Sequence, residues 1–162
     1  MDKEEFTRLV LAMESTLFHV SYTLLHNEQD CADVVQEAVI KAYASRGKLR
    51  EQGYFKTWIV RILINECYTF LRRQKRYVPL EEEAVGGYGI VTEVSSPIRE
   101  EYLDLYRAME ELSEKDRLCI QLFYMEDYSV RQIAQILKIP EGTVKSRMRR
   151  ARLQLKGLLV EE

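Results

Sequence analysis

Five polar side chains near the C-terminal end of the chain have the types and spacing needed to bind DNA. They are Thr143, Lys145, Ser146, Arg149 and Arg150. An arginine guanidinium can donate two parallel hydrogen bonds to guanine, serine and threonine can bond bases or phosphates, and lysine binds the phosphate backbone. On a helix these side chains lie together, opposite an apolar arc. The residues of that arc are Val144, Met148, Ala151 and Leu155.

The elements that would position this face are two helices joined by a short turn, within residues 129–156. The segment carries eight lysines and arginines against one acid, in a chain whose formal net charge is −2. Ala134 allows a close helix crossing, Val144 can pack back on it, and Ile139 fills the turn. The turn position that is usually glycine is occupied by Lys138. A non-glycine residue in the left-handed conformation costs about 1 kcal/mol. A solvated basic helix would share the charge but not this spacing, so the pattern favours a helix-turn-helix.

A second basic block occupies residues 41–76, which hold ten lysines and arginines and two acids. Acidic stretches lie on either side of it. Residues 1–40 hold eight acids and two bases, and residues 81–114 hold ten acids and two bases. Two basic blocks separated by acidic ones suggest two places where a polyanion is held.

Apolar residues recur at steps of three and four through most of the chain, and strand-like alternation is hard to find. Before the two basic helices, this pattern predicts further helices over 3–26, 31–45, 56–76, 98–112 and 113–125. Asp30 is the expected cap of the second of these helices. Ser113 and Ser129 begin capping-box patterns at the start of later helices.

The periodicity fails from Tyr77 to Pro97. This stretch holds two of the three prolines, three glycines and an acidic run, which are features of a linker. We therefore predict an all-α chain of two small helical domains. Their ranges are 1–77 and 98–162, joined by a flexible acidic linker over 78–97.

The three cysteines, Cys31, Cys67 and Cys119, are far apart and lie beside apolar residues. Small buried hydrophobic residues in a reducing cytoplasm are the favoured interpretation. A zinc site built from His19, His26 and Cys31 is an alternative, although its spacing matches no usual pattern. No apolar run approaches the roughly eighteen residues of a membrane span, and the first ten residues lack a signal-peptide core. We expect a cytoplasmic protein.

The segment LSEKDRLCIQLFYMEDYSVRQIAQILKIPEGTVKSRMRRARLQLK resembles region 4 of bacterial RNA polymerase sigma factors. The likeness is greatest to the extracytoplasmic-function (ECF) group, sigma-70 family group 4, whose signature is close to IPxGTVKSRxxRAR. NEQDCADVVQEAVIKAY resembles region 2.2, and YFKTWIVRILINECYTFLRRQKR resembles regions 2.3 and 2.4. The matches occur in the expected order and cover nearly the whole chain. The sequence departs from the family at Thr69, where aspartate is frequent.

The resemblance implies roles for named residues. Residues that match the contact with the core polymerase are Asp33, Gln36, Glu37 and Ile40. Residues that match the surface meeting the melted −10 strand or its phosphates are Lys48, Tyr54, Phe55, Lys56, Trp58, Arg61, Asn65, Arg72 and Arg73. The −35 readers would be the five residues introduced first. Exposed aromatic rings can stack on unstacked bases while cations hold phosphates, which suits the second set. For Phe55 and Trp58, a place mainly in the hydrophobic core is the alternative interpretation.

The resemblance further implies a non-enzymatic protein without a cofactor. Its partners would be promoter DNA, the β′ clamp coiled coil and β flap of the polymerase core, and an anti-sigma factor, which in this family is often membrane-anchored. An ordinary helix-turn-helix repressor or activator is the alternative, but it has no need of the region 2-like surfaces. A nuclease would require clustered carboxylates or a similar catalytic group, and the sequence shows none.

Overall fold

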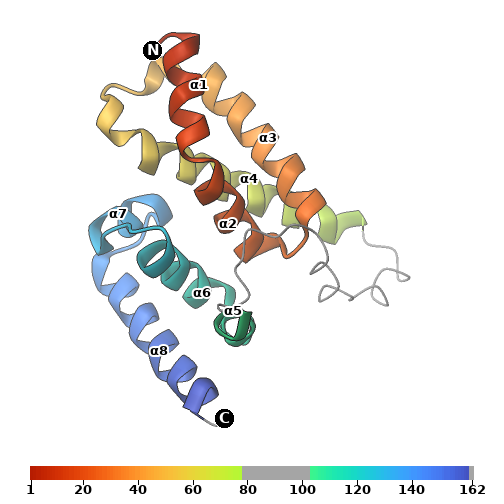
Figure 1. Ribbon diagram of the computed structural model, residues 1–162, viewed down its shortest axis with the longest axis vertical. Helices are drawn as coiled ribbons and strands as arrows, with labels where there is room; N and C mark the ends of the chain where they lie inside the picture. The colour runs from red at the N-terminus through yellow and green to blue at the C-terminus, as the bar shows by residue number, and fades with distance from the viewer. Residues whose placement is uncertain (78–102, 161–162) are drawn as a thin grey trace. The chain divides into compact units, whose positions relative to one another are not determined.

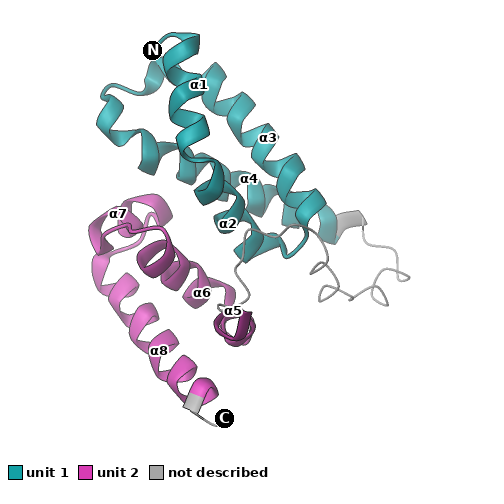
Figure 2. Cartoon of the chain, in the orientation of Figure 1, with its two compact units in different colours: residues 1–95 teal, residues 96–162 magenta. Residues whose placement is uncertain are grey.

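The computed structural model describes residues 1–77 and 103–160, and these form two compact units within residues 1–95 and 96–162. Figure 2 shows the first unit in teal and the second in magenta. The described residues are helical, with no strand among them. The all-α prediction is therefore confirmed. The predicted linker, 78–97, and residues 98–102 lie outside the described residues.

In its described part, residues 1–77, the first unit contains four α-helices, which are labelled in Figure 1. They are α1 (Lys3–Ala12), α2 (Glu14–Leu25), α3 (Glu28–Ala44) and α4 (Phe55–Tyr77). Two short 3₁₀ turns, η1 (Arg46–Lys48) and η2 (Gln52–Tyr54), connect α3 to α4. Helices α2, α3 and α4 pack against one another around a core that includes Leu17, Val20, Ala38, Ile59 and Leu63.

Two predictions at the start of this unit are wrong. The helix expected over 3–26 is divided at Met13, whose backbone leaves the helical region at φ −101° and ψ 1°. Met13 itself is buried, so the apolar stripe continues through the break and conceals it in the sequence. The next helix begins earlier than expected because Asn27, not Asp30, is its cap. The side chain of Asn27 accepts a hydrogen bond of 2.8 Å from the backbone N–H of Asp30.

The second unit contains α5 (Leu103–Glu110), α6 (Glu114–Ile120), α7 (Val130–Leu137) and α8 (Glu141–Val160). Helix α6 begins at its predicted cap, since the Ser113 side chain accepts a hydrogen bond from the backbone N–H of Asp116. The helix expected to continue to residue 125 instead widens into a π-helical turn, η6 (Gln121–Met125). Helices α5, α6 and α7 all contact the long helix α8, which is therefore the centre of this unit.

Candidate nucleic-acid interface

The turn between α7 and α8 has the expected local geometry. Ser129 and Gln132 form a reciprocal capping box, with hydrogen bonds of 2.9 Å and 3.1 Å between each side chain and the other residue's backbone N–H. Lys138 ends α7 in the left-handed conformation, at φ 56°. The backbone N–H of Ile139 then donates to the carbonyl of Ala134. The capping box fixes the start of α7, and the contacts of Lys138 and Ile139 end it, so together they determine how the chain enters α8.

Helix α8 divides into two faces, as the sequence predicts. Val144, Met148, Ala151 and Leu155 are buried, and Val144 and Ala151 are fully inaccessible. The opposite side, which we call the α8 face, comprises Thr143, Lys145, Ser146, Arg149 and Arg150. All are exposed except Thr143, which is half-buried. The packing of the apolar arc therefore holds a polar and cationic surface toward solvent.

One residue of the α8 face has a partner that periodicity does not predict. The guanidinium of Arg150 donates from Nε and Nη2 to the two carboxylate oxygens of Asp116, at 2.7 Å and 2.6 Å. The Asp116 side chain is 2% exposed, whereas that of Arg150 is 62% exposed. This paired contact joins α6 to α8 and makes Arg150 part of the structural frame of the unit.

The same contact makes the stability of the second unit depend on pH. Hydrogen bonding from Arg150 lowers the pKa of the Asp116 carboxyl below its ordinary 3.8, against the opposing effect of burial. Because the folded-state pKa is depressed, ionised Asp116 stabilises the fold above pH 3.8, and this contribution is lost as the pH falls through the lowered value.

Asp116→Asn should lower the melting temperature measured in thermal unfolding at neutral pH. Below the lowered pKa, the difference in melting temperature between this variant and the parent should become smaller. A constant difference would contradict this assignment.

Two further arginines of α8 turn toward neighbouring elements. Arg152 Nη1 donates to the hydroxyl of Tyr124 at 3.3 Å. Arg147 lies beside Cys119, where burial raises the pKa of the thiol and Arg147 opposes that rise. Neither arginine belongs to the α8 face.

Helix α4 and the turn before it carry most of the predicted −10 residues. Tyr54 is 59% exposed, and Trp58 and Arg61 are half-buried. Tyr54, Trp58, Arg61, Asn65 and Arg72 follow one side of the helix at steps of three, four and seven. We call these five residues, together with Lys48 of η1 and Arg73, the α4 face. Lys56 lies two positions from both Tyr54 and Trp58, which places it on the opposite side of the helix.

Phe55 is a correction to the predicted −10 set. Its ring is 1% exposed and lies in the core of the first unit, with its centroid 5.9 Å from that of Phe6 and 5.9 Å from that of Trp58. The ring cannot stack on a base without leaving the core. Its place at the first position of α4 instead anchors the start of this helix, next to Tyr54, which is exposed in the turn before it.

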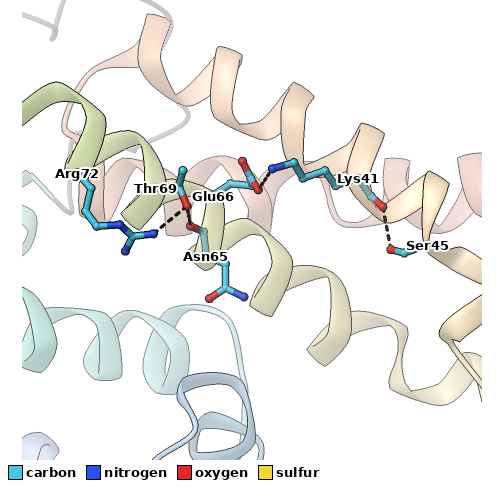
Figure 3. Close-up of polar contacts among 6 residues, drawn as sticks. All are labelled: Lys41, Ser45, Asn65, Glu66, Thr69 and Arg72. Atoms are coloured by element: carbon cyan, nitrogen blue, oxygen red, sulfur yellow. Dashed lines mark hydrogen bonds and ion pairs between the residues drawn. The ribbon is translucent and has the colours of Figure 1, made fainter. Parts of the chain in front are cut away.

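Thr69 organises the polar side chains on the same helix (Figure 3). Its hydroxyl donates to the backbone carbonyl of Asn65 at 2.9 Å and accepts from Arg72 Nη2 at 3.1 Å. In the family that this chain resembles, aspartate is frequent at this position. An aspartate here would be an anion and would form an ion pair with Arg72. The threonine orients Arg72 without neutralising it, so the positive charge remains available to a phosphate.

The third predicted surface lies on α3. We call four residues of this helix the α3 patch: Asp33, Gln36, Glu37 and Ile40. Glu37 and Ile40 are exposed. Ile40 is a large apolar side chain that is accessible over 56% of its surface. Beside the patch, Lys41 pairs with Glu66 of α4 at 2.5 Å (Figure 3). The patch therefore presents two acids, an amide and an apolar group on a helix that is tied firmly to α4.

Comparison with known proteins shows the family to which this chain belongs. Residues 9–77 match the family Sigma-70 region 2, and residues 102–155 match Sigma-70, region 4. The RNA polymerase sigma-H factor of Pseudomonas aeruginosa is 32% identical, across 93% of this chain and 84% of the relative. The ECF RNA polymerase sigma-E factor of Escherichia coli is 37% identical, across 76% of this chain and 70% of the relative. The chain is a bacterial sigma factor of the ECF group.

Solved structures agree with this assignment. The sigma factor RpoE of Bartonella quintana, in complex with the anti-sigma factor NepR, superposes with a TM-score of 0.79 at 28% identity, covering 96% of this chain and 97% of that one. CnrH, in complex with the cytosolic domain of CnrY, shares the fold, with a TM-score of 0.71. The sigma factor described here thus directs promoter-specific transcription with RNA polymerase and is not an enzyme, which excludes the repressor and nuclease alternatives.

The zinc alternative finds no support in the described part of this sigma factor. Within residues 1–77 and 103–160, no group of three or more histidine, cysteine, aspartate or glutamate side chains is placed to hold a metal ion. Cys31, Cys67 and Cys119 are buried, and none of the three forms a disulfide. Burial raises the pKa of Cys31 to about 11, which favours the neutral thiol over a metal-binding thiolate. Among the described helices, none combines the length and apolar character of a membrane span.

Proposed function

We propose that three surfaces of this sigma factor divide the work of initiation. The α3 patch docks on the β′ clamp coiled coil of the polymerase core. The α4 face holds the melted strand of the −10 element, and the α8 face reads the −35 element in the major groove. The observation that carries the proposal is that cationic or aromatic surfaces occur on both units, while the acidic patch lies on a separate helix.

The chemistry of each surface suits its proposed partner. Carboxylates around one exposed isoleucine complement a basic and partly apolar protein surface. Exposed aromatic rings beside cations suit an unpaired strand, because stacking tolerates any base and cations hold the backbone. A recognition helix reads bases with its N-terminal half, which is where Lys145, Ser146 and Arg149 lie. The second unit would also contact the β flap, as the family resemblance implies.

We further propose that an anti-sigma factor, soluble or membrane-anchored, occupies these surfaces when transcription is not required. Support comes from the Bartonella quintana relative, which was solved bound to one. The protein would then act in the cytoplasm, where polymerase and promoters are found. No small-molecule substrate or cofactor has a part in this proposal.

Substitution of Tyr54 tests the −10 role. Its ring is 59% exposed, so removing it costs the fold little. Stacking of a base on an aromatic side chain contributes roughly 1–3 kcal/mol, and Tyr54→Ala should therefore lower the equilibrium constant for promoter opening roughly 5- to 150-fold. Permanganate reactivity of unpaired thymines, measured on a promoter bound by the holoenzyme, gives that constant from the fraction of open complexes.

Tyr54→Phe is the matched control because it keeps the ring and removes only the hydroxyl. It should retain most of the opening. If Tyr54→Ala opens the promoter as well as the parent does, the ring takes no part in holding the melted strand.

A further inference from the structure

Asp116 is a buried carboxylate that lies directly beneath the proposed −35 surface. It is 2% exposed and sits near the start of α6, where its backbone N–H donates to the Ser113 cap. A buried charge is costly unless it is paired. Here both carboxylate oxygens accept hydrogen bonds from Arg150 of α8. The contact therefore determines the orientation of an arginine that is largely exposed to solvent.

Asp116 binds one edge of the Arg150 guanidinium, and a second edge remains accessible. An arginine has five N–H donors in one plane. Asp116 accepts from Nε and from Nη2, which together form the side edge of the group. The remaining donors on Nη1 and Nη2 form the tip, which points away from Asp116. The Arg150 side chain is 62% exposed, so this tip is accessible to a ligand.

The ion pair with Asp116 also immobilises the Arg150 side chain. A long exposed arginine normally loses rotamer freedom when it binds, and that loss weakens the interaction. With Nε and Nη2 held at 2.7 Å and 2.6 Å, the plane of Arg150 is already fixed in the absence of DNA. By contrast, Lys145 and Arg149 on the same face make no ion pair with any described part of the chain. Arg150 is thus pre-oriented in a way that its neighbours are not.

We infer that Asp116 is a positioning residue for promoter recognition, which holds Arg150 so that its tip donates two parallel hydrogen bonds to a pair of acceptors on the −35 DNA. The inference rests on the proposed role of the α8 face. Such a pair of acceptors is offered by O6 and N7 of guanine or by two phosphate oxygens. Asp116 itself does not touch the DNA.

The test uses holoenzyme reconstituted with each variant and a −35 element selected from a randomised promoter library. Affinity is then measured for that element and for its single-base derivatives. Asp116→Asn keeps the size of the side chain but removes its charge. If Arg150 reads a guanine, discrimination at one −35 position should fall roughly 5- to 150-fold. An equal loss on all derivatives would also support positioning, with phosphate as the ligand.

Arg150→Lys guards against a variant that fails to fold. Lysine keeps a cation beside Asp116 but has no planar tip, so it should show the same loss of −35 recognition as Asp116→Asn. Because the buried carboxylate stays paired with a cation, its unfolding temperature should fall less than that of Asp116→Asn. In the Arg150→Lys background, Asp116→Asn should cause no further loss of discrimination. Additive losses would overturn the inference.

A purely structural contact gives a different result. In that case Asp116→Asn would lower the unfolding temperature while the folded fraction kept the affinity and base preference of the parent, and the inference would fail. Lys145→Ala separates this outcome from failure of the underlying proposal. If substitutions of Lys145 and Arg150 both leave −35 binding unchanged, the α8 face does not read the promoter at all.

Discussion

Glu37→Lys is expected to weaken binding to the polymerase core by about 100-fold or more. Glu37 is exposed in the middle of the α3 patch, and we propose that this patch meets a basic surface. A lysine there would place like charges opposite each other, which costs several kcal/mol across an interface. The fold should tolerate the change because the side chain faces solvent. Titration of fluorescently labelled core with the purified variant measures the loss.

A charge reversal elsewhere on the first unit provides the control. Glu4 is exposed on α1, away from the α3 patch in sequence and on a different helix. Glu4→Lys changes the net charge by the same amount and should leave core affinity within about twofold of the parent, since isolated surface charges contribute little. If both variants bind equally weakly, the loss reflects overall charge. If both bind normally, Glu37 is outside the interface.

Replacing Lys145 and Arg149 together should remove most −35 recognition. Each arginine at a true base contact contributes roughly 1–3 kcal/mol, and the loss of each phosphate contact lowers the salt dependence of binding by about one unit of slope. Both side chains are exposed, and alanine favours a helix at least as well as they do. The folded second unit should therefore persist. Holoenzyme affinity for promoter DNA across a salt series is the measurement.

Lys156→Ala is the matched control for this pair. Lys156 is exposed on the same helix, beyond the N-terminal half that reads the groove. Its substitution should leave base preference unchanged. A loss as large as that of the double variant would mean that α8 binds DNA through general charge and not through a recognition face.

The helix-turn-helix could be predicted from the sequence because its determinants are local. The capping box at Ser129, the left-handed Lys138 and the apolar arc from Val144 to Leu155 each depend on residues within a few turns of one another. Helical periodicity then assigns every side chain of α8 to a face. The exposure of the α3 patch follows in the same way, from the spacing of the buried residues on α3.

Other features depend on tertiary contacts, which the periodicity of the sequence does not predict. The break at Met13 preserves the apolar stripe, and the π-helical turn Gln121–Met125 preserves the run of buried residues. The burial of Phe55 depends on Phe6, which lies far away in the sequence. Each of these is decided by tertiary packing, so no local pattern could have shown it.

The pairing of Asp116 with Arg150 joins residues 34 positions apart. One signal could have revealed it. Asp116 lies beside the apolar run that α6 buries, and a carboxylate in a buried position requires a cationic or hydrogen-bonding partner. Helix α8 is the richest source of cations in the second unit. The need of this acid for a partner therefore points to the α8 arginines even from the sequence alone.

Run-off transcription shows most directly whether this chain gives polymerase core its promoter specificity. Purified core, the full chain and DNA carrying the promoters of genes activated on its overexpression are combined with nucleotides. We expect transcripts from one defined start on each template, absent without the chain and lost with Glu37→Lys. The contradictory result is a chain that binds these DNA fragments by itself while core starts at the same sites, with the same efficiency, whether or not the chain is present.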